Sequence, residues 1–222
     1  MNLCLFDLDH TLLPLDSDHA WGEFVVTLGW AEAAAQRAEN DRFYAAYQDG
    51  SLDIDAYVEF DTRAWRGRPL AEQAAAQARF MREVIRPAIR AEALELVRDH
   101  QRRGELIAIV SATNEFVTRP IAAAFGVETL IAVELERDAE GRATGRIRGT
   151  PSFRDGKNRR VEQWLAGLGR RVQDFGRVTV YSDSPNDLPL LELASHPVAT
   201  NPSPALETLA RQRGWPILKL FP

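Results

Sequence analysis

The sequence has one cysteine, no excess of basic residues and no apolar run long enough to span a bilayer. Cys4 has no partner for an internal disulfide, and its apolar surroundings favour a buried hydrophobe over a reactive thiol. The 27 basic and 32 acidic residues give a net charge of -5, which offers no footprint for nucleic acid. The amino terminus lacks a charged segment followed by a cleavable apolar one. We expect a cytoplasmic protein that binds neither nucleic acid nor membrane.

Strand-like and helical patterns alternate along most of the chain. Apolar runs with the length of strands recur at 2–9, 105–112, 129–137, 177–183 and 197–201. Helical patterns follow over 87–103, 114–125, 157–168 and 186–194. This order predicts an α/β fold with a doubly wound, mainly parallel, Rossmann-like sheet, in which ligands bind at the carboxyl ends of the strands. The segment 128–149 is also typical of a β-hairpin, with its turn at 138–141.

Residues 15–86 contain no convincing strand and predict an inserted all-helical cap. Amphipathic patterns cover 17–28, 30–48, 53–65 and 69–85. The segment has eight arginines, no lysine and thirteen acidic residues, so it carries the whole net charge of the chain. The predicted division is therefore a core of residues 1–14 and 87–222 with the cap 15–86 between its two parts.

The first predicted strand ends in Phe6-Asp7-Leu8-Asp9-His10-Thr11-Leu12. Side chains alternate along a strand, so Asp7 and Asp9 point to the same side. Two carboxylates this close repel each other unless a cation or a shared proton compensates them. The pair predicts a site for metal-assisted chemistry.

Three further polar motifs lie where predicted strands or turns end. Ser111 and Ala112 stand at a strand-to-helix junction, where free backbone N–H groups and a hydroxyl can hold a phosphate. Lys157 begins a helix after a turn and brings a positive charge to the same edge. Asp183 and Asp187 follow the apolar run 177–183, and Asp183 is a suitable third oxygen ligand for a hard cation.

The order Asp-x-Asp-x-Thr, Ser, Lys and Ser-Asp-Ser-x-Asn-Asp resembles the four motifs of the haloacid dehalogenase superfamily of aspartate-based phosphatases. The helical insertion resembles that of the phosphoserine phosphatase-like branch. The resemblance implies a magnesium-dependent phosphomonoesterase that acts on a small phosphorylated metabolite. It makes Asp7 the nucleophile, which forms an aspartyl phosphate, and Asp9 the general acid and then the general base.

The same resemblance implies roles for the other motif residues. Mg²⁺ is expected on the carboxylates of Asp7 and Asp183 and the backbone carbonyl of Asp9. The expected phosphate ligands are Ser111, the amide of Ala112, and Lys157, which is also catalytic. Supporting positions are Thr11, Asn186 and Asp187. Two departures from the motifs are serines at 182 and 184 and a histidine at 10, where many relatives have glycine.

Substrate choice is expected to depend on the cap, because the core motifs contact only the phosphate. Asp16 and Asp18 lie just beyond the first loop and favour an amine-bearing leaving group such as histidinol. Arg63 and Arg66 are candidates to hold a carboxylate, as in phosphoserine, or are solvated surface residues.

Other readings of these residues remain open. Each motif can be a turn or helix cap, although four caps at one sheet edge would be a coincidence. A phosphotransferase or mutase would use the same aspartates, and a non-catalytic module would bind a phosphorylated metabolite without turnover.

Overall fold

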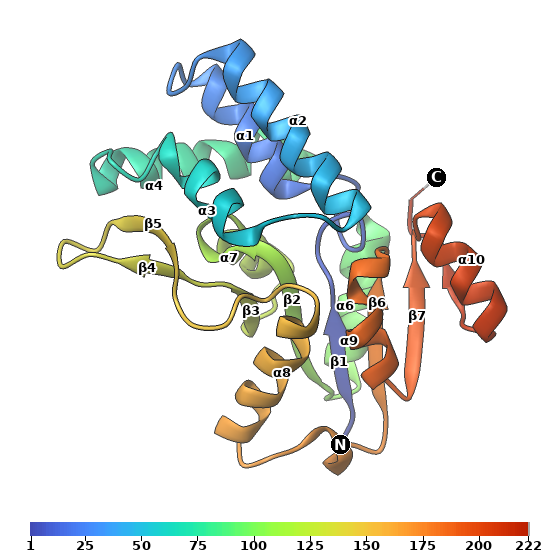
Figure 1. Cartoon of the computed structure of the whole chain (residues 1–222). Helices are drawn as coiled ribbons and strands as arrows, with labels where there is room; N and C mark the ends of the chain where they lie inside the picture. The colour runs from blue at the N-terminus through green and yellow to red at the C-terminus, as the bar shows by residue number, and fades with distance from the viewer. Residues whose placement is uncertain (222) are drawn as a thin grey trace.

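A parallel sheet forms the centre of the computed structural model, which describes residues 1–221 (Figure 1). Its six strands are all paired in parallel. In spatial order they are β3 (Leu130–Val133), β2 (Leu106–Asn114), β1 (Leu3–Phe6), β6 (Val178–Ser182), β7 (His196–Thr200) and β8 (Ile217–Leu218). The predicted α/β fold with a mainly parallel sheet is confirmed.

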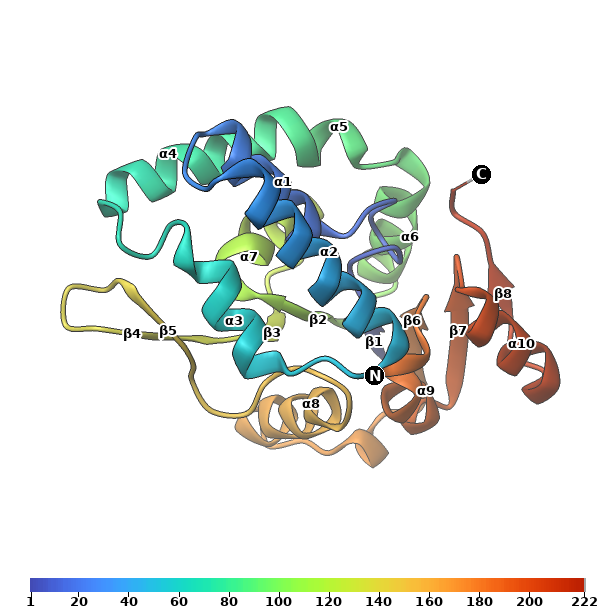
Figure 2. The same ribbon diagram turned by 45° about the horizontal axis from the view of Figure 1, so that its top comes forward.

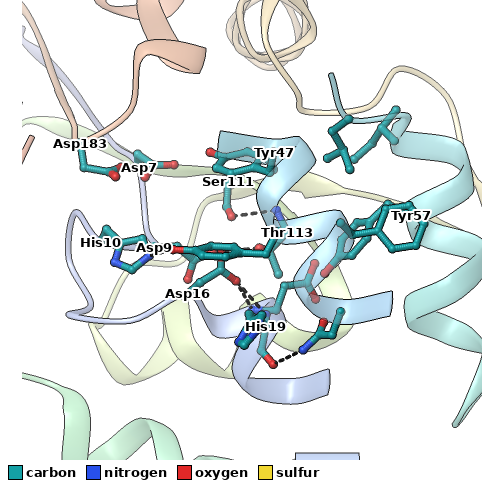
Figure 3. A pocket seen from close by; sticks show the side chains of 17 residues that line it. Asp7, Asp9, His10, Asp16, His19, Tyr47, Tyr57, Ser111, Thr113 and Asp183 are labelled. Carbon is teal, nitrogen blue, oxygen red and sulfur yellow. Dashed lines mark hydrogen bonds between the residues drawn. The ribbon is translucent and has the colours of Figure 1, made fainter. Parts of the chain in front are cut away.

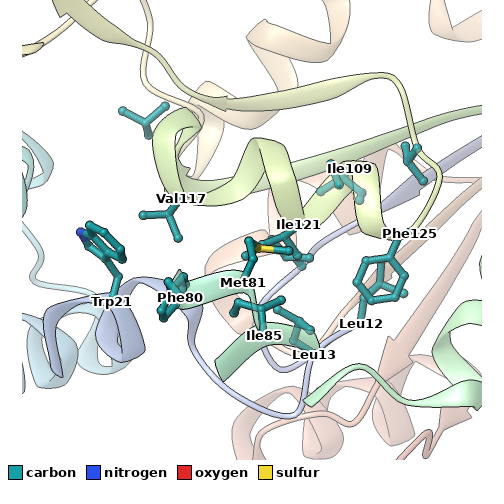
Figure 4. Close-up of a cluster of buried hydrophobic side chains, with 14 of the residues drawn as sticks. Leu12, Leu13, Trp21, Phe80, Met81, Ile85, Ile109, Val117, Ile121 and Phe125 are labelled. Carbon is teal, nitrogen blue, oxygen red and sulfur yellow. The ribbon is translucent and has the colours of Figure 1, made fainter. Parts of the chain in front are cut away.

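The sheet has a hydrophobic core on each face, and the two cores are built from alternate residues of the same strands. In β1, Cys4 and Phe6 face one core while Leu3 and Leu5 face the other, and all four are fully buried. Helices α6 (Ala91–Arg102) and α7 (Glu115–Ala124) contribute to the first core. Figure 4 shows part of it, where Ile121 approaches Met81 and Ile85. The second core contains residues of α8 (Asp155–Gly167), α9 (Leu188–Leu193) and α10 (Pro204–Arg213).

A layer of helices covers the carboxyl edge of the sheet (Figure 2). It consists of α1 (Ser17–Thr27), α2 (Ala33–Asp49), α3 (Ile54–Arg63) and α4 (Leu70–Phe80). Acidic side chains cap the first three helices, since Asp16, Glu32 and Asp53 accept hydrogen bonds from backbone N–H groups in the first turns. A π-helix, η1 (Met81–Ile85), and the short α5 (Arg86–Ala88) continue α4 towards the core. We call residues 15–86 the cap.

The segment 128–149, predicted to form one β-hairpin, is divided between two sheets. β3 joins the main sheet beside β2, and only β4 (Leu135–Arg137) and β5 (Ala143–Ile147) form an antiparallel pair. The continuous strand predicted over 129–137 is therefore wrong. The reason is its changing pattern: residues 130–133 are uniformly apolar, as in a strand covered on both faces, whereas polar residues alternate beyond them.

Other element boundaries also differ. The helix predicted over 87–103 is broken, because Ile89 and Arg90 between α5 and α6 have extended backbone. α10 and β8 were not predicted. None of the helices in residues 1–221 has the length and apolar character needed to cross a bilayer.

The close packing of α1 on α2 within the cap can be tested by substitution of Gly22. Gly22 lies against Asn40, whose Nδ2 donates a hydrogen bond of 2.9 Å to the carbonyl of His19. A Cβ at position 22 would lie 2.6 Å from that nitrogen. We predict that Gly22→Ala lowers the free energy of unfolding by about 1–2 kcal/mol, although alanine favours a helix by about 1 kcal/mol.

Urea denaturation measures this effect. Gly167→Ala in α8 is the matched control, because a Cβ there meets no atom within 4 Å, and it should be neutral or slightly stabilising. A Gly22→Ala protein as stable as the wild type would show that the two helices do not pack this closely.

Candidate functional site

The register of the parallel strands brings the polar motifs to one edge. Phe6 at the end of β1 pairs with Ile109 of β2 and Tyr181 of β6, so Asp7, Ser111 and Asp183, one or two residues further along, lie at the same edge. The Asp7 amide extends this pairing by donating to the Tyr181 carbonyl at 2.9 Å. After Asp9 the chain turns through His10, which has a left-handed φ of 56°. This backbone conformation explains why glycine also suits that position.

Lys157 is the buried cation of the site. Its Nζ donates to Asp7 Oδ1 at 2.8 Å and lies 2.7 Å from Asp187 Oδ1, and its side chain is only 1% exposed. Burial lowers the pKa of this lysine, but the charges of Asp187 and Asp7 outweigh burial and raise it. Lys157 is therefore protonated at neutral pH and fixes the Asp7 carboxylate.

Thr11 links Asp7 to Asp183. Its Oγ1 lies 3.0 Å from Asp7 Oδ2 and 3.3 Å from Asp183 Oδ1, and it accepts a 3.0 Å hydrogen bond from the Asp183 amide. Burial, followed by the charges of Asp7 and Asp187, raises the pKa of Asp183 well above its usual value. Two buried carboxylates thus pair with Lys157, and the half-buried Asp183 lies beside Asp7. Their oxygen donors fit a hard divalent cation such as Mg²⁺.

Asp9 points into a different environment. Its Oδ1 accepts a 2.8 Å hydrogen bond from the Ser17 amide, and its Oδ2 accepts one of 2.9 Å from Thr113 Oγ1. Burial and then the charge of Asp16 raise the pKa of Asp9 to about 6, although both hydrogen bonds oppose this shift. Asp9 can therefore exchange a proton near neutral pH, which suits a general acid or base.

The remaining predicted core residues surround these carboxylates. Ser111 Oγ accepts a 3.1 Å hydrogen bond from the Thr113 amide, and Ser111 and Ala112 both line the pocket described next. Asp187 also accepts a 2.8 Å hydrogen bond from Ser182. Asn186 contacts the cap instead, because its Nδ2 donates to the Tyr47 carbonyl at 2.8 Å.

A pocket between the sheet edge and the cap contains most of the predicted site (Figure 3). Its wall includes the predicted residues Asp7, Asp9, Asp16, Asp18, Ser111, Ala112 and Asp183. Lys157, Thr11 and Asp187 are buried beside this wall. Arg63 and Arg66 do not line the pocket: Arg66 pairs with Glu59, and the Arg63 guanidinium lies 5.4 Å from the Phe60 ring.

Aromatic and histidine side chains of the pocket wall were not predicted from the sequence. Phe43, Tyr44, Tyr47, Tyr57 and His19 come from the cap, and His10 from the loop after β1 also lines the pocket. His10 Nε2 and Tyr44 Oη are 3.1 Å apart, which gives this histidine the hydrogen-bond partner that the sequence could not identify. The grouping of Phe43, Tyr44 and Tyr47 on α2 was the available signal, but such a group equally predicts a cap core.

Asp18 and Asp61 form a second group of buried acidic residues, and Asn114 of the core connects them. Asn114 Nδ2 donates to Asp18 Oδ1 at 3.3 Å and to Asp61 Oδ2 at 2.9 Å. Each carboxylate residue is only 5% exposed. Burial raises the pKa of Asp61 to about 7, and burial followed by the charge of Asp61 raises the pKa of Asp18 well above its usual value.

Comparisons with known proteins agree on a single family. Residues 4–192 match the family model of haloacid dehalogenase-like hydrolases. The chain is 44% identical over 217 residues to a histidinol-phosphatase of Neisseria meningitidis, covering 98% of each protein.

Solved structures with the same fold include relatives at very different distances. A Bordetella pertussis protein of unknown function has 50% identity and a TM-score of 0.93, with 99% of each chain covered. A substrate-bound phosphoserine phosphatase has a TM-score of 0.69 over 97% of this chain and 91% of its own, but only 18% identity. The latter likeness is evidence for the fold alone.

The buried acid pair generates a stability prediction. The pKa of Asp61 rises from 3.8 to about 7 on folding, so the folded state binds its proton more tightly and stability is lost as pH rises through this window. Asn at this position does not titrate. Asp61→Asn should therefore raise the free energy of unfolding at pH 8 by about 1–3 kcal/mol, with little gain at pH 4.

Urea denaturation at the two pH values provides the measurement. Asp55→Asn removes an exposed carboxylate from the same helix and should change stability equally little at both. Equal effects of Asp61→Asn at pH 4 and pH 8 would mean that Asp61 is ionised without cost.

Proposed function

This chain belongs to the haloacid dehalogenase-like hydrolase family, and we propose that it hydrolyses small phosphate esters whose alcohol carries a cation, with histidinol phosphate as the representative substrate. The chain is a phosphoric monoester hydrolase. The finer assignment is supported by the relative named histidinol-phosphatase, which aligns over 98% of both chains. It is also supported by the chemistry of the pocket wall.

The proposed substrate class is inferred mainly from the residues of the pocket wall. Acidic and aromatic residues line it, and no arginine or lysine is among the described residues that do. A carboxylate such as that of phosphoserine would meet uncompensated negative charge there. An ammonium or imidazolium group would meet carboxylates and aromatic faces, both of which attract cations.

Asp7 is the nucleophile in this proposal. One of its carboxylate oxygens attacks the phosphorus, forming an aspartyl phosphate as the bond to the alcohol oxygen breaks. Lys157, at 2.8 Å from Asp7, holds the carboxylate and neutralises part of the charge that accumulates. Ser111 and the Ala112 amide bind the phosphate oxygens, while Thr11, Asn186 and Asp187 support the surrounding loops.

Asp9 moves the protons. Its protonated carboxyl donates to the departing alcohol oxygen, and the resulting carboxylate then accepts a proton from the water that attacks the phosphorus. This water attack releases inorganic phosphate and restores Asp7. A pKa of about 6 allows Asp9 to occupy both protonation states during one cycle.

Magnesium is the proposed cofactor. The carboxylates of Asp7 and Asp183 and the backbone carbonyl of Asp9 would hold it, because hard cations prefer such oxygen ligands. When bound, Mg²⁺ supplies positive charge that offsets repulsion between the phosphate and the carboxylates. Residues 15–86 would cover the site as a cap and contact the alcohol part of the substrate.

The nucleophile assignment predicts the effect of one isosteric change. Asp7→Asn should reduce hydrolysis of p-nitrophenyl phosphate at least about a thousand-fold, because an amide does not form the covalent intermediate. EDTA should abolish wild-type activity, and added Mg²⁺ should restore it. Equal release of inorganic phosphate and p-nitrophenol distinguishes hydrolysis from transfer to a second acceptor.

Asp138→Asn is the matched control, because it removes one carboxylate from the exposed turn between β4 and β5 and should leave the rate unchanged. Substantial turnover by Asp7→Asn would exclude Asp7 as the nucleophile. Turnover that survives EDTA would exclude a metal requirement.

The substrate assignment predicts a preference between two phosphate esters. The value of kcat/KM for histidinol phosphate should exceed that for phosphoserine by at least about a hundred-fold, because the phosphoserine carboxylate faces the acidic wall. Steady-state measurements of phosphate release provide the comparison. A preference for phosphoserine would contradict the assignment, even if both compounds were hydrolysed.

A further inference from the structure

We infer that Asp18, Asp61 and Asn114 form the subsite for the substrate's cationic group, with Asp18 binding the cation and the other two residues positioning Asp18. This inference rests on the proposed hydrolysis of cationic phosphate esters. The cation would then be recognised by Asp18, which Asn114 of the core links to Asp61 of the cap. Asp16, which also lines the pocket, would not be the main cation ligand.

Asn114 is fixed in one orientation by the core. As the N-cap of α7, it accepts hydrogen bonds from the Phe116 and Val117 amides at 3.0 and 3.2 Å through its Oδ1. Its Nδ2 is therefore directed at the cap, where it donates to Asp18 of α1 and Asp61 of α3. One neutral side chain at the end of β2 thus holds two carboxylates from different helices.

The two carboxylates have no cationic partner of their own. Within residues 1–221, neither Asp18 nor Asp61 forms a salt bridge with lysine, arginine or histidine, although each is only 5% exposed. His19, the nearest histidine along the chain, instead pairs with Asp41 at 2.9 Å. Two buried carboxylates held by one side chain repel each other when ionised, and a cation bound in the adjacent pocket would compensate their charge.

The pocket leads from the proposed phosphate site to Asp18. Asp18 lies on its wall together with Tyr57, whose hydroxyl forms a hydrogen bond that lowers the pKa of Asp18. Figure 3 shows Tyr57 at the opposite end of the pocket from Asp7 and Asp183. A substrate with its phosphorus at Asp7 can therefore extend its cationic end towards Asp18, between aromatic side chains that also attract cations.

Asp16 is less suited to this role, although it also lines the pocket. Its Oδ1 already accepts hydrogen bonds from the Asp18 and His19 amides, at 3.0 and 2.8 Å, as the N-cap of α1. Asp61 lies outside the pocket wall and reaches the ligand only through its effect on Asp18 and Asn114. Direct contact is therefore assigned to Asp18 alone.

Inhibition by L-histidinol tests the subsite, because this compound carries the cation but no phosphate. The inhibition constants of L-histidinol and of inorganic phosphate are measured for the hydrolysis of p-nitrophenyl phosphate. The quantity compared is the ratio of the first constant to the second, because inorganic phosphate binds at the other end of the pocket. The ratio should rise at least about ten-fold in Asp18→Asn and about three-fold or more in Asp61→Asn. Asp55→Asn, which removes an exposed carboxylate from α3, should leave it unchanged.

The double variant distinguishes positioning from a general structural effect. If Asp61 acts through Asp18, adding Asp61→Asn to Asp18→Asn should not increase the ratio further. Additive effects in the double variant would exclude the positioning role. A ratio that stays unchanged in Asp18→Asn would overturn the subsite. If Asp18→Asn does not fold, an unchanged ratio in Asp61→Asn would overturn it.

Results with the wild type distinguish this inference from the proposed function. Hydrolysis of p-nitrophenyl phosphate without any inhibition by L-histidinol would overturn the subsite and leave the phosphatase chemistry intact. Inhibition by L-histidinol that is lost in Asp18→Asn, without turnover of histidinol phosphate, would support the subsite and contradict the proposed substrate.

Discussion

The buried ion pairs of Lys157 are the interactions on which the rest of the site depends. Removing an ammonium group from water is costly, and only closely placed carboxylates compensate this cost. Lys157 of α8 meets Asp7 after β1 and Asp187 after β6, so one cation joins three segments of the core. The position of Asp7 is consequently set by the fold itself. The half-buried Asp183 lies nearby, so this edge of the sheet has more carboxylates than cations. The proposed divalent cation would offset that excess of negative charge.

Two aspartates separated by one residue acquire different chemistry from their surroundings. Asp7 accepts a 2.8 Å hydrogen bond from the ammonium of Lys157. Asp9 accepts hydrogen bonds from Ser17 of the cap and from Thr113 of β2, and burial raises its pKa to about 6. Such a division suits one carboxylate that attacks and another that exchanges protons. The cap thus holds the Asp9 carboxylate through the Ser17 amide, in addition to contributing to the pocket wall.

Local patterns predicted the parts of the site that depend on strand register. Asp7 and Asp183 follow β1 and β6, Ser111 lies in the last part of β2, and parallel pairing brings these positions to one edge. The cap was harder to predict, because sequence does not reveal which helix face meets the pocket. Arg66 pairs with Glu59, and Asp61 contacts Asn114 although 53 residues separate them.

The unpredicted α10 did carry recognisable signals. Ser203 caps its start, Pro204 occupies its first turn, and Gly214 ends it in a left-handed conformation.

The central claim is that Asp7 becomes phosphorylated. Borohydride reduction of enzyme quenched during turnover converts an aspartyl phosphate to homoserine, which peptide mass spectrometry locates. We expect homoserine in place of Asp7 and of no other aspartate. Modification at Asp9 or Asp183 instead, or none during rapid turnover, would contradict it.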